Sequence, residues 1–314
     1  MELSILVISR TYKLINRLLK SISYNTYLNK LNFEIICSWN GKFKDLKKIK
    51  IPENLSLIIR EIKPYNFANN MNELIKISKG KFLLIINDDV ILDKNSIEYG
   101  LRLINANNNI GLVGGNLRDR KNFLTHAGVN FNFLNSPYHF LEGQINYKIN
   151  FLKKNFTIPA STGALMLTKK EIFKKIKFNE NYQVCGEDIE LCLDIRELLG
   201  MEIWFCHLFT GIHEAETTRK KMPHQKKNIF DKKRLMKRYS LFLKTLGRDQ
   251  LLDIYNFDKK ILNSIFKYKI KTFEKRIHTD YWLIILINML KIKIKILIKV
   301  LALNIKNSQI LNRF

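Results

Sequence analysis

The chain has 314 residues and a formal net charge of +26, and 46% of its residues are hydrophobic against 26% that are charged. This balance argues against global disorder and allows one packed domain with an extension. The positive charge is concentrated in residues 214–314, which hold 25 Lys and Arg against 8 Asp and Glu. An anionic partner is expected for that region: a membrane surface, a nucleic acid or a phosphorylated substrate.

Cysteine usage and hydropathy indicate a cytoplasmic protein. The four cysteines (Cys37, Cys185, Cys192 and Cys206) stand among apolar neighbours without CxxC spacing, which favours reduced, buried thiols over disulfides or zinc. The N-terminal MELSILVISR is too short in its apolar part for a signal peptide. No stretch reaches 18 uncharged apolar residues, so we expect no membrane span.

The first 110 residues alternate strands with helices. Four short apolar runs predict buried strands, at 3–9, 33–37, 55–60 and 81–86. Ala68, Met71, Ile75 and Ser78 trace one face of a helix that Gly80 closes as a C-cap. This alternation predicts an α/β fold with an open, mostly parallel, Rossmann-like sheet flanked by helices.

The pattern loosens beyond residue 110. Further strands are predicted at 111–117, 159–168 and 202–206, and a helix is predicted from Glu187 to Gly200. After about residue 220 the chain becomes basic and helical. We therefore expect an α/β domain over residues 1–220 and a basic helical region over 221–314.

Acidic residues follow the fourth predicted strand at once, in Asn87-Asp88-Asp89. Ligands of open α/β sheets bind beyond the carboxyl ends of the strands. Adjacent carboxylates raise each other's pKa, and a hard divalent cation such as Mg²⁺ or Mn²⁺ relieves their repulsion. A strand-ending turn, which Asn and Asp favour, explains the motif equally well, so both interpretations remain open here.

A second acidic pair opens the 187–200 helix, in Gly186-Glu187-Asp188. Asp188 continues the apolar stripe of that helix, so its carboxylate points inward, towards the core or a cleft. The alternative is a pair of acids that interact favourably with the helix dipole, which does not account for the inward direction. Catalysis is slightly favoured.

Other chemical motifs are few. His213 follows the last predicted strand; a lone histidine is more often structural than a ligand, but imidazole near Asp89 would complete a metal shell. The segment after the first strand, Ser9-Arg10-Thr11, contains no GxGxxG, which disfavours a dinucleotide-binding site. The chain also lacks a P-loop, an HExxH motif and a GxSxG elbow.

Five segments in order resemble glycosyltransferase family 2, in the branch that makes O-antigen and other surface polysaccharides. They are NFANNMNELIKISKGKFLLIINDDV (66–90), THAGV (125–129), STGALMLTKKEIF (161–173), GEDIELCLDIRELLG (186–200) and HEAETTRK (213–220), with a weaker echo in NIFDKKRLMKRY (228–239). The resemblance implies a GT-A fold, with a nucleotide-sugar-binding half over about 1–117 and an acceptor-binding half over about 118–220.

The resemblance also implies residue roles. Asp89 and His213 would bind Mn²⁺ or Mg²⁺, and Asp188 would be the general base with Glu187 as its acidic neighbour. The residues implied to bind the donor are Arg10, Thr11, Asn66, Asn70, Asp88, Thr162, Gly163 and Ala164. The family's aspartate after the second strand is missing from residues 37–42, where Trp39 could stack on a donor base or pack against the sheet.

The implied function is metal-dependent, inverting transfer of a sugar from a UDP- or dTDP-sugar to a hydroxyl of a glycan or lipid-linked acceptor. In residues 281–305, Lys291, Lys295 and Lys299 recur at fourfold spacing, as in a helix lying on an anionic membrane; a helix packed on the catalytic domain is equally compatible. Such attachment would place the enzyme at the inner face of the cytoplasmic membrane. A catalytically inactive nucleotide-sugar-binding protein is the main alternative, and a nucleic-acid-binding protein is disfavoured.

Overall fold

The computed structural model describes residues 1–62, 65–131, 135–139, 141–143, 146–148, 150–214, 225–247 and 249–251. Contacts divide the chain into two compact units. The first comprises Met1–Asn130 and Pro137–Leu235, and the second comprises Phe131–Ser136 and the chain from Met236 onward. The first unit thus continues past residue 220, where the sequence predicts a boundary. The predicted helix over 281–305 lies outside the described residues.

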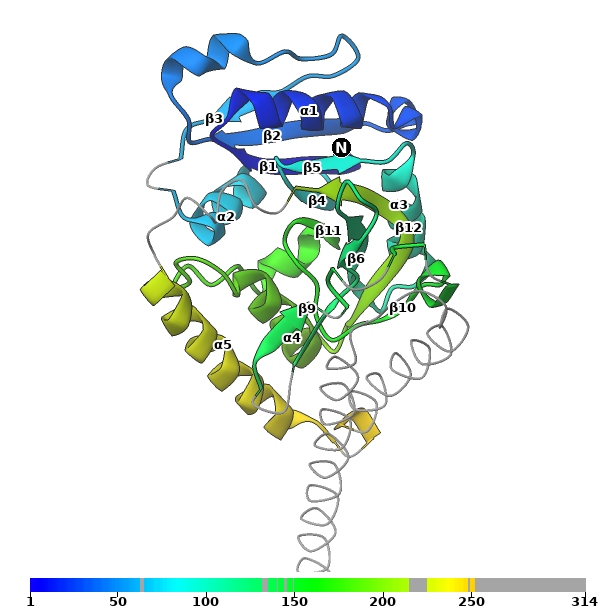
Figure 1. Ribbon diagram of the computed structural model, residues 1–314, viewed down its shortest axis with the longest axis vertical. Helices are drawn as coiled ribbons and strands as arrows, with labels where there is room; N and C mark the ends of the chain where they lie inside the picture. Colours follow the sequence, from blue (N-terminus) through cyan, green and yellow to red (C-terminus); the bar gives the residue numbers. More distant parts are fainter. Residues whose placement is uncertain are drawn as a thin grey trace, which may run out of the picture. The chain divides into compact units, whose positions relative to one another are not determined.

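One ten-stranded mixed sheet forms the centre of the first unit (Figure 1). Its main path runs β10-β12-β6-β11-β4-β1-β2-β3, with β5 paired to β12 and β7 to β6. The strands are β1 (Leu3–Ser9), β2 (Phe33–Trp39), β3 (Ile58–Arg60), β4 (Phe82–Asn87), β5 (Val90–Leu92), β6 (Ile110–Arg118), β7 (Leu124–His126), β10 (Phe156–Thr157), β11 (Leu165–Lys169) and β12 (Glu202–His213). A separate two-stranded sheet pairs β8 (Val129–Phe131) with β9 (Pro137–His139).

The neighbours β3, β2, β1 and β4 run parallel, and so do β6 and β12. The strand β11 lies antiparallel between β4 and β6. The α/β class and the flanked central sheet are therefore confirmed, with antiparallel strands added on the side of β4 away from β1. Parallel β4 is buried along its whole apolar run and β1 along all of its run except the half-buried Ile8, as expected for strands covered on both faces.

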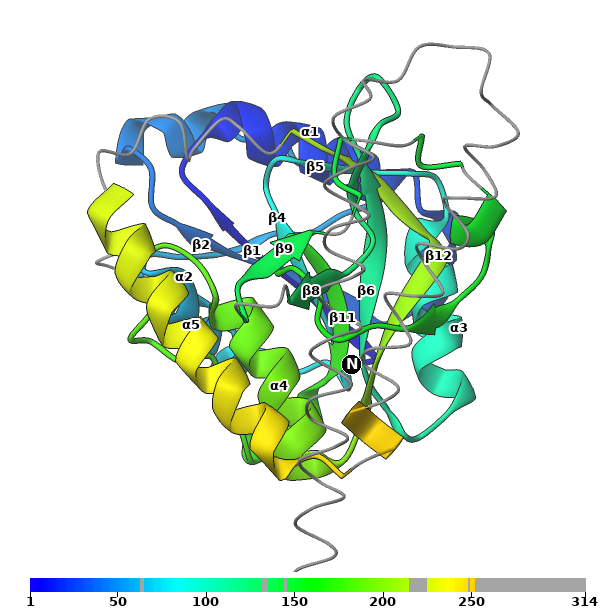
Figure 2. The ribbon, with the colours of Figure 1, turned by 60° about the horizontal axis from the view of Figure 1, so that its bottom comes forward.

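Five α-helices and four short 3₁₀ helices accompany the sheets in the described residues. The α-helices are α1 (Tyr12–Ser23), α2 (Phe67–Ile77), α3 (Ser96–Ala106), α4 (Glu187–Leu199) and α5 (Gln225–Thr245). The 3₁₀ helices are η1 (Thr26–Lys30), η2 (Phe43–Lys48), η3 (Asn150–Lys153) and η4 (Lys170–Lys174). Apolar residues of α1 and α3 share one core cluster with alternate residues of β1, whereas α2 packs on β1 and β2 outside that cluster (Figure 2).

The register of the strands gathers polar side chains at one edge of the sheet. Ile8 of β1 lies opposite Asn87 of β4, so Ser9-Arg10 and Asp88-Asp89 leave the sheet together. The segment that enters β11 ends beside the same strand, since the Asn87 amide donates to the carbonyl of Ala164 over 3.0 Å. The carboxyl ends of the parallel strands thus form the edge where ligands of such sheets bind.

The strand β12 is longer than the sequence predicts. The apolar run suggests residues 202–206, but the strand continues to His213 through an irregularity between Cys206 and Thr210. Beyond that point β12 pairs with β5, which a pattern of apolar residues alone does not reveal. The extension carries His213 to the strand-end edge.

No helix among the described residues has both the length and the hydropathy required to cross a membrane.

Candidate functional site

A cleft of about 280 Å³ lies at the strand-end edge of the first unit. Most of the predicted site residues line it: Arg10, Asp88, Asp89, Thr162, Gly163, Ala164, Glu187, Asp188 and His213. They come from the ends of β1, β4 and β12, from the segment before β11 and from the first turn of α4. Asp89 and Asp188, which the sequence assigns to metal binding and to the general base, therefore line one cleft.

Backbone pairing brings Asp89 and His213 together. In the antiparallel ladder between β5 and β12, Val90 is the partner of His213, and the Glu214 amide donates to the Asp89 carbonyl over 3.2 Å. The two side chains therefore meet, with His213 Nε2 3.3 Å from Asp89 Oδ1. A lone histidine is more often structural than a ligand. A position beside Asp89, however, is the one in which the His213 imidazole could complete a metal shell.

These two side chains fit a divalent cation. Asp89 is 9% exposed, and its buried Oδ1 accepts no hydrogen bond within the described part of the chain, where His213 Nε2 is its neighbour at 3.3 Å. A buried carboxylate oxygen in this condition is costly unless a cation or donor completes it. Within the residues that the structure describes, no three His, Cys, Asp or Glu side chains gather at one possible metal site. Of the described residues, Asp89 and His213 would be ligands of such an ion, and water and phosphate oxygens would complete its shell, as is common for Mg²⁺.

Asp88 occupies a different position from Asp89. Its Oδ2 accepts a hydrogen bond of 2.6 Å from the hydroxyl of Ser9 at the end of β1. Desolvation raises the pKa of Asp88 to about 7 against the lowering effect of Ser9; the nearby charge of Asp89 raises it further and that of Arg10 lowers it. The charge of Asp89 thus disfavours the charged form of Asp88, as the sequence predicts for adjacent carboxylates, and Arg10 is a cation near Asp88.

Asp188 is held by backbone amides. Its Oδ2 accepts from the Gly163 amide over 2.7 Å, and its Oδ1 accepts from the Ile189 amide over 2.8 Å. A Cβ on residue 163 would lie 3.1 Å from the Phe67 ring and 3.4 Å from the Cβ of Asp188, so glycine allows this close approach. The carboxylate thus has a fixed orientation and remains partly exposed in the cleft wall.

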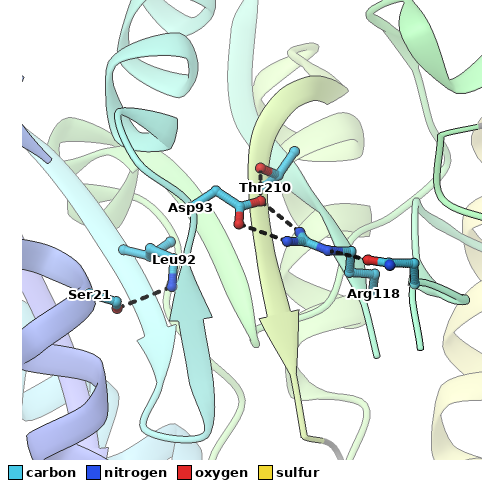
Figure 3. A network of polar contacts seen from close by, with 6 residues as sticks. Ser21, Leu92, Asp93, Arg118 and Thr210 are labelled. Carbon is cyan, nitrogen blue, oxygen red and sulfur yellow. Dashed lines mark hydrogen bonds and ion pairs between the residues drawn. The ribbon is translucent and has the colours of Figure 1, made fainter. Parts of the chain in front are cut away.

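An ion pair between the half-buried Asp93 and the buried Arg118 braces the strands that carry Asp89 and His213 (Figure 3). Asp93, directly after β5, receives two hydrogen bonds from the Arg118 guanidinium, at 2.6 and 2.8 Å, and one from the Thr210 hydroxyl. Although burial acts to raise the pKa of Asp93, Arg118 and Thr210 hold it below its usual value. The Leu92 amide also donates to Ser21 Oγ of α1 over 3.1 Å. The β5–β12–β6 edge is thereby fixed to α1.

Two histidines of the cleft could not be ranked from the sequence. His126 is 1% exposed, and its Nδ1 lies 2.8 Å from His139 Nδ1. The Thr162 amide donates to His126 Nε2 over 3.4 Å, which assigns the His126 proton to Nδ1 and makes His139 Nδ1 an acceptor. Burial and two nearby histidines lower the pKa of His126 well below 6.5, so the ring is neutral. Both rings line the cleft.

Four predicted donor-binding residues do not line this cleft. Thr11 lines a neighbouring hollow that shares Arg10 with it. Trp39 is 1% exposed and packs in the core, where its indole donates to the Lys42 carbonyl, so it follows the packing alternative. Asn66 caps α2, and the fully buried Asn70 bonds to Ser38 and the backbone.

One aromatic side chain that lines the cleft could not be predicted from the sequence. Tyr65 is 43% exposed, and the Arg10 guanidinium stands 4.6 Å from the centre of its ring. It immediately precedes the 66–90 segment, but no periodicity or motif distinguishes it from other tyrosines. Only the folded chain shows that this ring, and not Trp39, is open to a planar ligand.

Comparisons with known proteins show the family and the fold of the chain. The family model described as Glycosyl transferase family 2 matches residues 4–177. The chain is 25% identical over 188 residues to the uncharacterized protein y4gI of Sinorhizobium fredii, covering 55% of this chain and 20% of that protein. It is 28% identical over 136 residues to the O-antigen biosynthesis protein RfbC of Myxococcus xanthus, covering 41% and 11% respectively.

Among solved structures, the chain is similar to GalNAc-T7 crystallised with UDP, GalNAc and Mn²⁺, with a TM-score of 0.54 at 14% identity. That likeness covers 68% of this chain and 44% of GalNAc-T7, and it confirms the predicted GT-A fold. The chain thus spans a fifth or less of the two curated relatives and under half of the solved structure. Because the family model matches more than half of its residues, the chain belongs to glycosyl transferase family 2.

Proposed function

We propose that this glycosyltransferase moves a sugar from a nucleoside-diphosphate sugar to a hydroxyl of a glycan or lipid-linked acceptor, with inversion at the anomeric carbon. One observation carries the proposal: the Asp89–His213 pair and the oriented carboxylate of Asp188 line a single cleft. A site for the charge of a leaving diphosphate and a base for an incoming hydroxyl are the two parts that a single displacement needs.

Asp188 is the general base of this scheme. Its carboxylate takes the proton of the acceptor hydroxyl while that oxygen bonds to the anomeric carbon and the bond from that carbon to the diphosphate oxygen breaks. The nucleoside diphosphate leaves with the electron pair of the broken bond. The amides of Gly163 and Ile189 fix the direction of the carboxylate before substrate binds. General-base assistance of this kind is typically worth ~10²–10⁴ in rate.

Asp89 and His213 would hold Mn²⁺ or Mg²⁺. When bound, such an ion supplies Lewis-acid stabilisation of the negative charge on the departing diphosphate. Asp89 contributes an otherwise unsatisfied buried oxygen, and the β5–β12 ladder keeps His213 beside it. GalNAc-T7, with the same fold, was crystallised with Mn²⁺ and UDP, which supports the choice of ion and of donor class.

Other residues of the cleft would bind the donor. Arg10 lies beside the acidic pair and faces the ring of Tyr65, so these two side chains would take the phosphate and the base. The segment from Thr162 to Ala164 and His139 would contact the sugar. The similarity to an O-antigen biosynthesis protein supports a role in polysaccharide synthesis, at the cytoplasmic face of a membrane where lipid-linked acceptors are met.

A donor screen tests the proposal. UDP- and dTDP-sugars are incubated with the protein and an acceptor panel, with Mn²⁺ or with a chelator, and release of the nucleoside diphosphate is measured. We expect metal-dependent release with at least one donor, abolished in Asp188→Asn. Tight donor binding measured by calorimetry, with no turnover, would instead support an inactive nucleotide-sugar-binding protein. That alternative is motivated by the absence of the family's aspartate from the segment near Trp39.

A further inference from the structure

A buried carboxylate on α5 holds the segment that leads to the proposed base. Asp231 is 2% exposed, and its Oδ2 accepts hydrogen bonds from three consecutive amides. The donors are Gln183 at 3.0 Å, Val184 at 2.7 Å and Cys185 at 3.2 Å. Hydrogen bonds to a charged acceptor are roughly twice as strong as neutral ones, so these three bonds fix the segment more firmly than bonds to a neutral acceptor would.

Neighbouring residues on the same face of α5 contact the same segment. Three positions before Asp231, Asn228 Oδ1 accepts from the Cys185 thiol over 3.0 Å. Three positions after it, the Arg234 guanidinium stands 5.6 Å from the centre of the Tyr182 ring. Residues spaced by three share a helix face. This face accounts for part of NIFDKKRLMKRY (228–239), a segment to which the proposed reaction gives no role.

The segment that α5 holds continues directly into the site. Gln183 and Val184 line the cleft, and the next residues are Gly186, Glu187 and Asp188. Gly186 has φ of +113°, a backbone conformation that favours glycine, and it is the N-cap residue of α4. The placement of α4 and of its first-turn carboxylate therefore depends on the path of residues 182–186.

We propose that Asp231 is a positioning residue: by fixing residues 183–185 it sets the start of α4 and hence the position of Asp188. The part of this inference that concerns sugar transfer rests on the proposed function, whereas the anchoring of the segment does not. Asp231 touches no substrate in this scheme. Its effect on the reaction is carried through the backbone of residues 183–188.

A matched control separates positioning from general stability. Glu34 on β2 is also a buried carboxylate, 5% exposed, and it accepts from the Lys79 amide and the Ser4 hydroxyl, each at 2.6 Å. It lies near the amino end of its strand and does not line the cleft. Glu34→Gln thus removes a similar buried charge at the other end of the sheet. Asp231→Asn, which keeps an acceptor oxygen, is paired with the more severe Asp231→Ala.

Hydrogen exchange of the full chain tests the anchoring without any need for activity. Loss of a charged acceptor should raise amide exchange at residues 183–185 about tenfold or more in both Asp231 variants. Glu34→Gln should raise it at Lys79 and leave residues 183–185 unchanged. Unchanged exchange at residues 183–185 in Asp231→Ala would overturn the proposal, and if that variant does not fold, the same result in Asp231→Asn would do so.

Kinetics then test the link to the reaction, with the donor sugar that the screen identifies. Asp231→Asn should lower kcat about tenfold or more and leave the Kd for UDP with Mn²⁺ within about twofold, since misplacement of a catalytic group acts on the chemical step. Normal kcat despite faster exchange would refute the positioning role. If the wild-type protein shows no turnover at all, the proposed function fails, and the exchange data still decide the anchoring.

Discussion

The cleft has two kinds of wall, and they are built in different ways. The strand-end wall carries Asp88 and Asp89 in the turn between β4 and β5, and His213 at the end of β12; the β1–β4 and β5–β12 ladders hold the residues on either side of that turn. The loop wall carries Asp188, and side-chain hydrogen bonds to backbone amides fix it there. The first construction suits a site for a charged diphosphate and metal that must not move. The second allows the base to be adjusted by residues distant in sequence.

The largest expected effect is the loss of turnover in a variant of the loop wall. Asp188→Asn should lower kcat by ~10²–10⁴ because the general base is lost, while nucleotide binding at the strand-end wall persists. Turnover of the donor that the screen identifies measures the loss of kcat, and calorimetry with UDP measures the retained nucleotide binding. Loss of UDP binding in this variant would mean that the two walls do not act separately.

A large effect is also expected at the strand-end wall. Asp89→Asn removes the carboxylate charge and should lower metal-dependent turnover by about 10²-fold or more, as for loss of one electrostatic contact to the developing charge. It should also weaken Mn²⁺-dependent UDP binding, which Asp188→Asn leaves intact. Addition of a chelator to the wild-type protein should reproduce both losses, and insensitivity to the chelator would contradict a metal role for Asp89.

The bracing of the strand-end wall predicts a moderate effect on stability. Arg118→Leu leaves the carboxylate of Asp93 without its guanidinium partner and should lower the free energy of unfolding by about 1–3 kcal/mol. Arg102→Leu is the matched control, because Arg102 is exposed and its pair with Glu98 within α3 should contribute only about 0.3–0.5 kcal/mol. Denaturant unfolding measures the free energy of unfolding of both variants. Equal midpoints would mean that the Arg118–Asp93 pair does not brace the edge.

The smallest effect is expected where the cleft meets the sugar. His139→Ala should leave UDP binding unchanged and weaken binding of the matching UDP-sugar about fivefold, the worth of one neutral hydrogen bond. His126→Ala should act in the same direction, because His126 orients the His139 ring. Calorimetry with UDP and the UDP-sugar in parallel makes the comparison. Equal weakening for both ligands would place these rings beside the nucleotide.

The same contrast between the walls explains which residues of the site could be predicted from the sequence. Asp89 was recognisable because it follows a buried apolar strand, and Asp188 because it continues the stripe of a helix; both patterns are local. His139 and Asp231 were not recognisable, since their partners, His126 and residues 183–185, are 13 and more than 45 positions away. Likewise, the burial of Trp39 and the openness of Tyr65 depend on tertiary packing that residue type does not encode.

In the fold, too, the strands with a local apolar pattern were predicted and those that depend on distant partners were missed. The parallel strands β1, β2 and β4 were predicted from their apolar runs, and the structure confirms them. The extension of β12 to His213 was missed because the strand continues through an irregularity into residues of mixed polarity. The short strand β5 was missed for a related reason: it follows the acidic turn directly, and its partner strand among the described residues, β12, lies more than 110 positions later in the sequence.

The most direct test of the account titrates UDP into the wild-type protein, Asp89→Asn and Asp188→Asn, each with and without Mn²⁺, alongside turnover of the responsive donor. We expect Mn²⁺ to strengthen UDP binding in the wild-type protein and in Asp188→Asn but not in Asp89→Asn, and turnover to be lost in both variants. Full turnover in Asp188→Asn, or Mn²⁺-enhanced UDP binding in Asp89→Asn equal to that of the wild type, would contradict the assignment of the two walls.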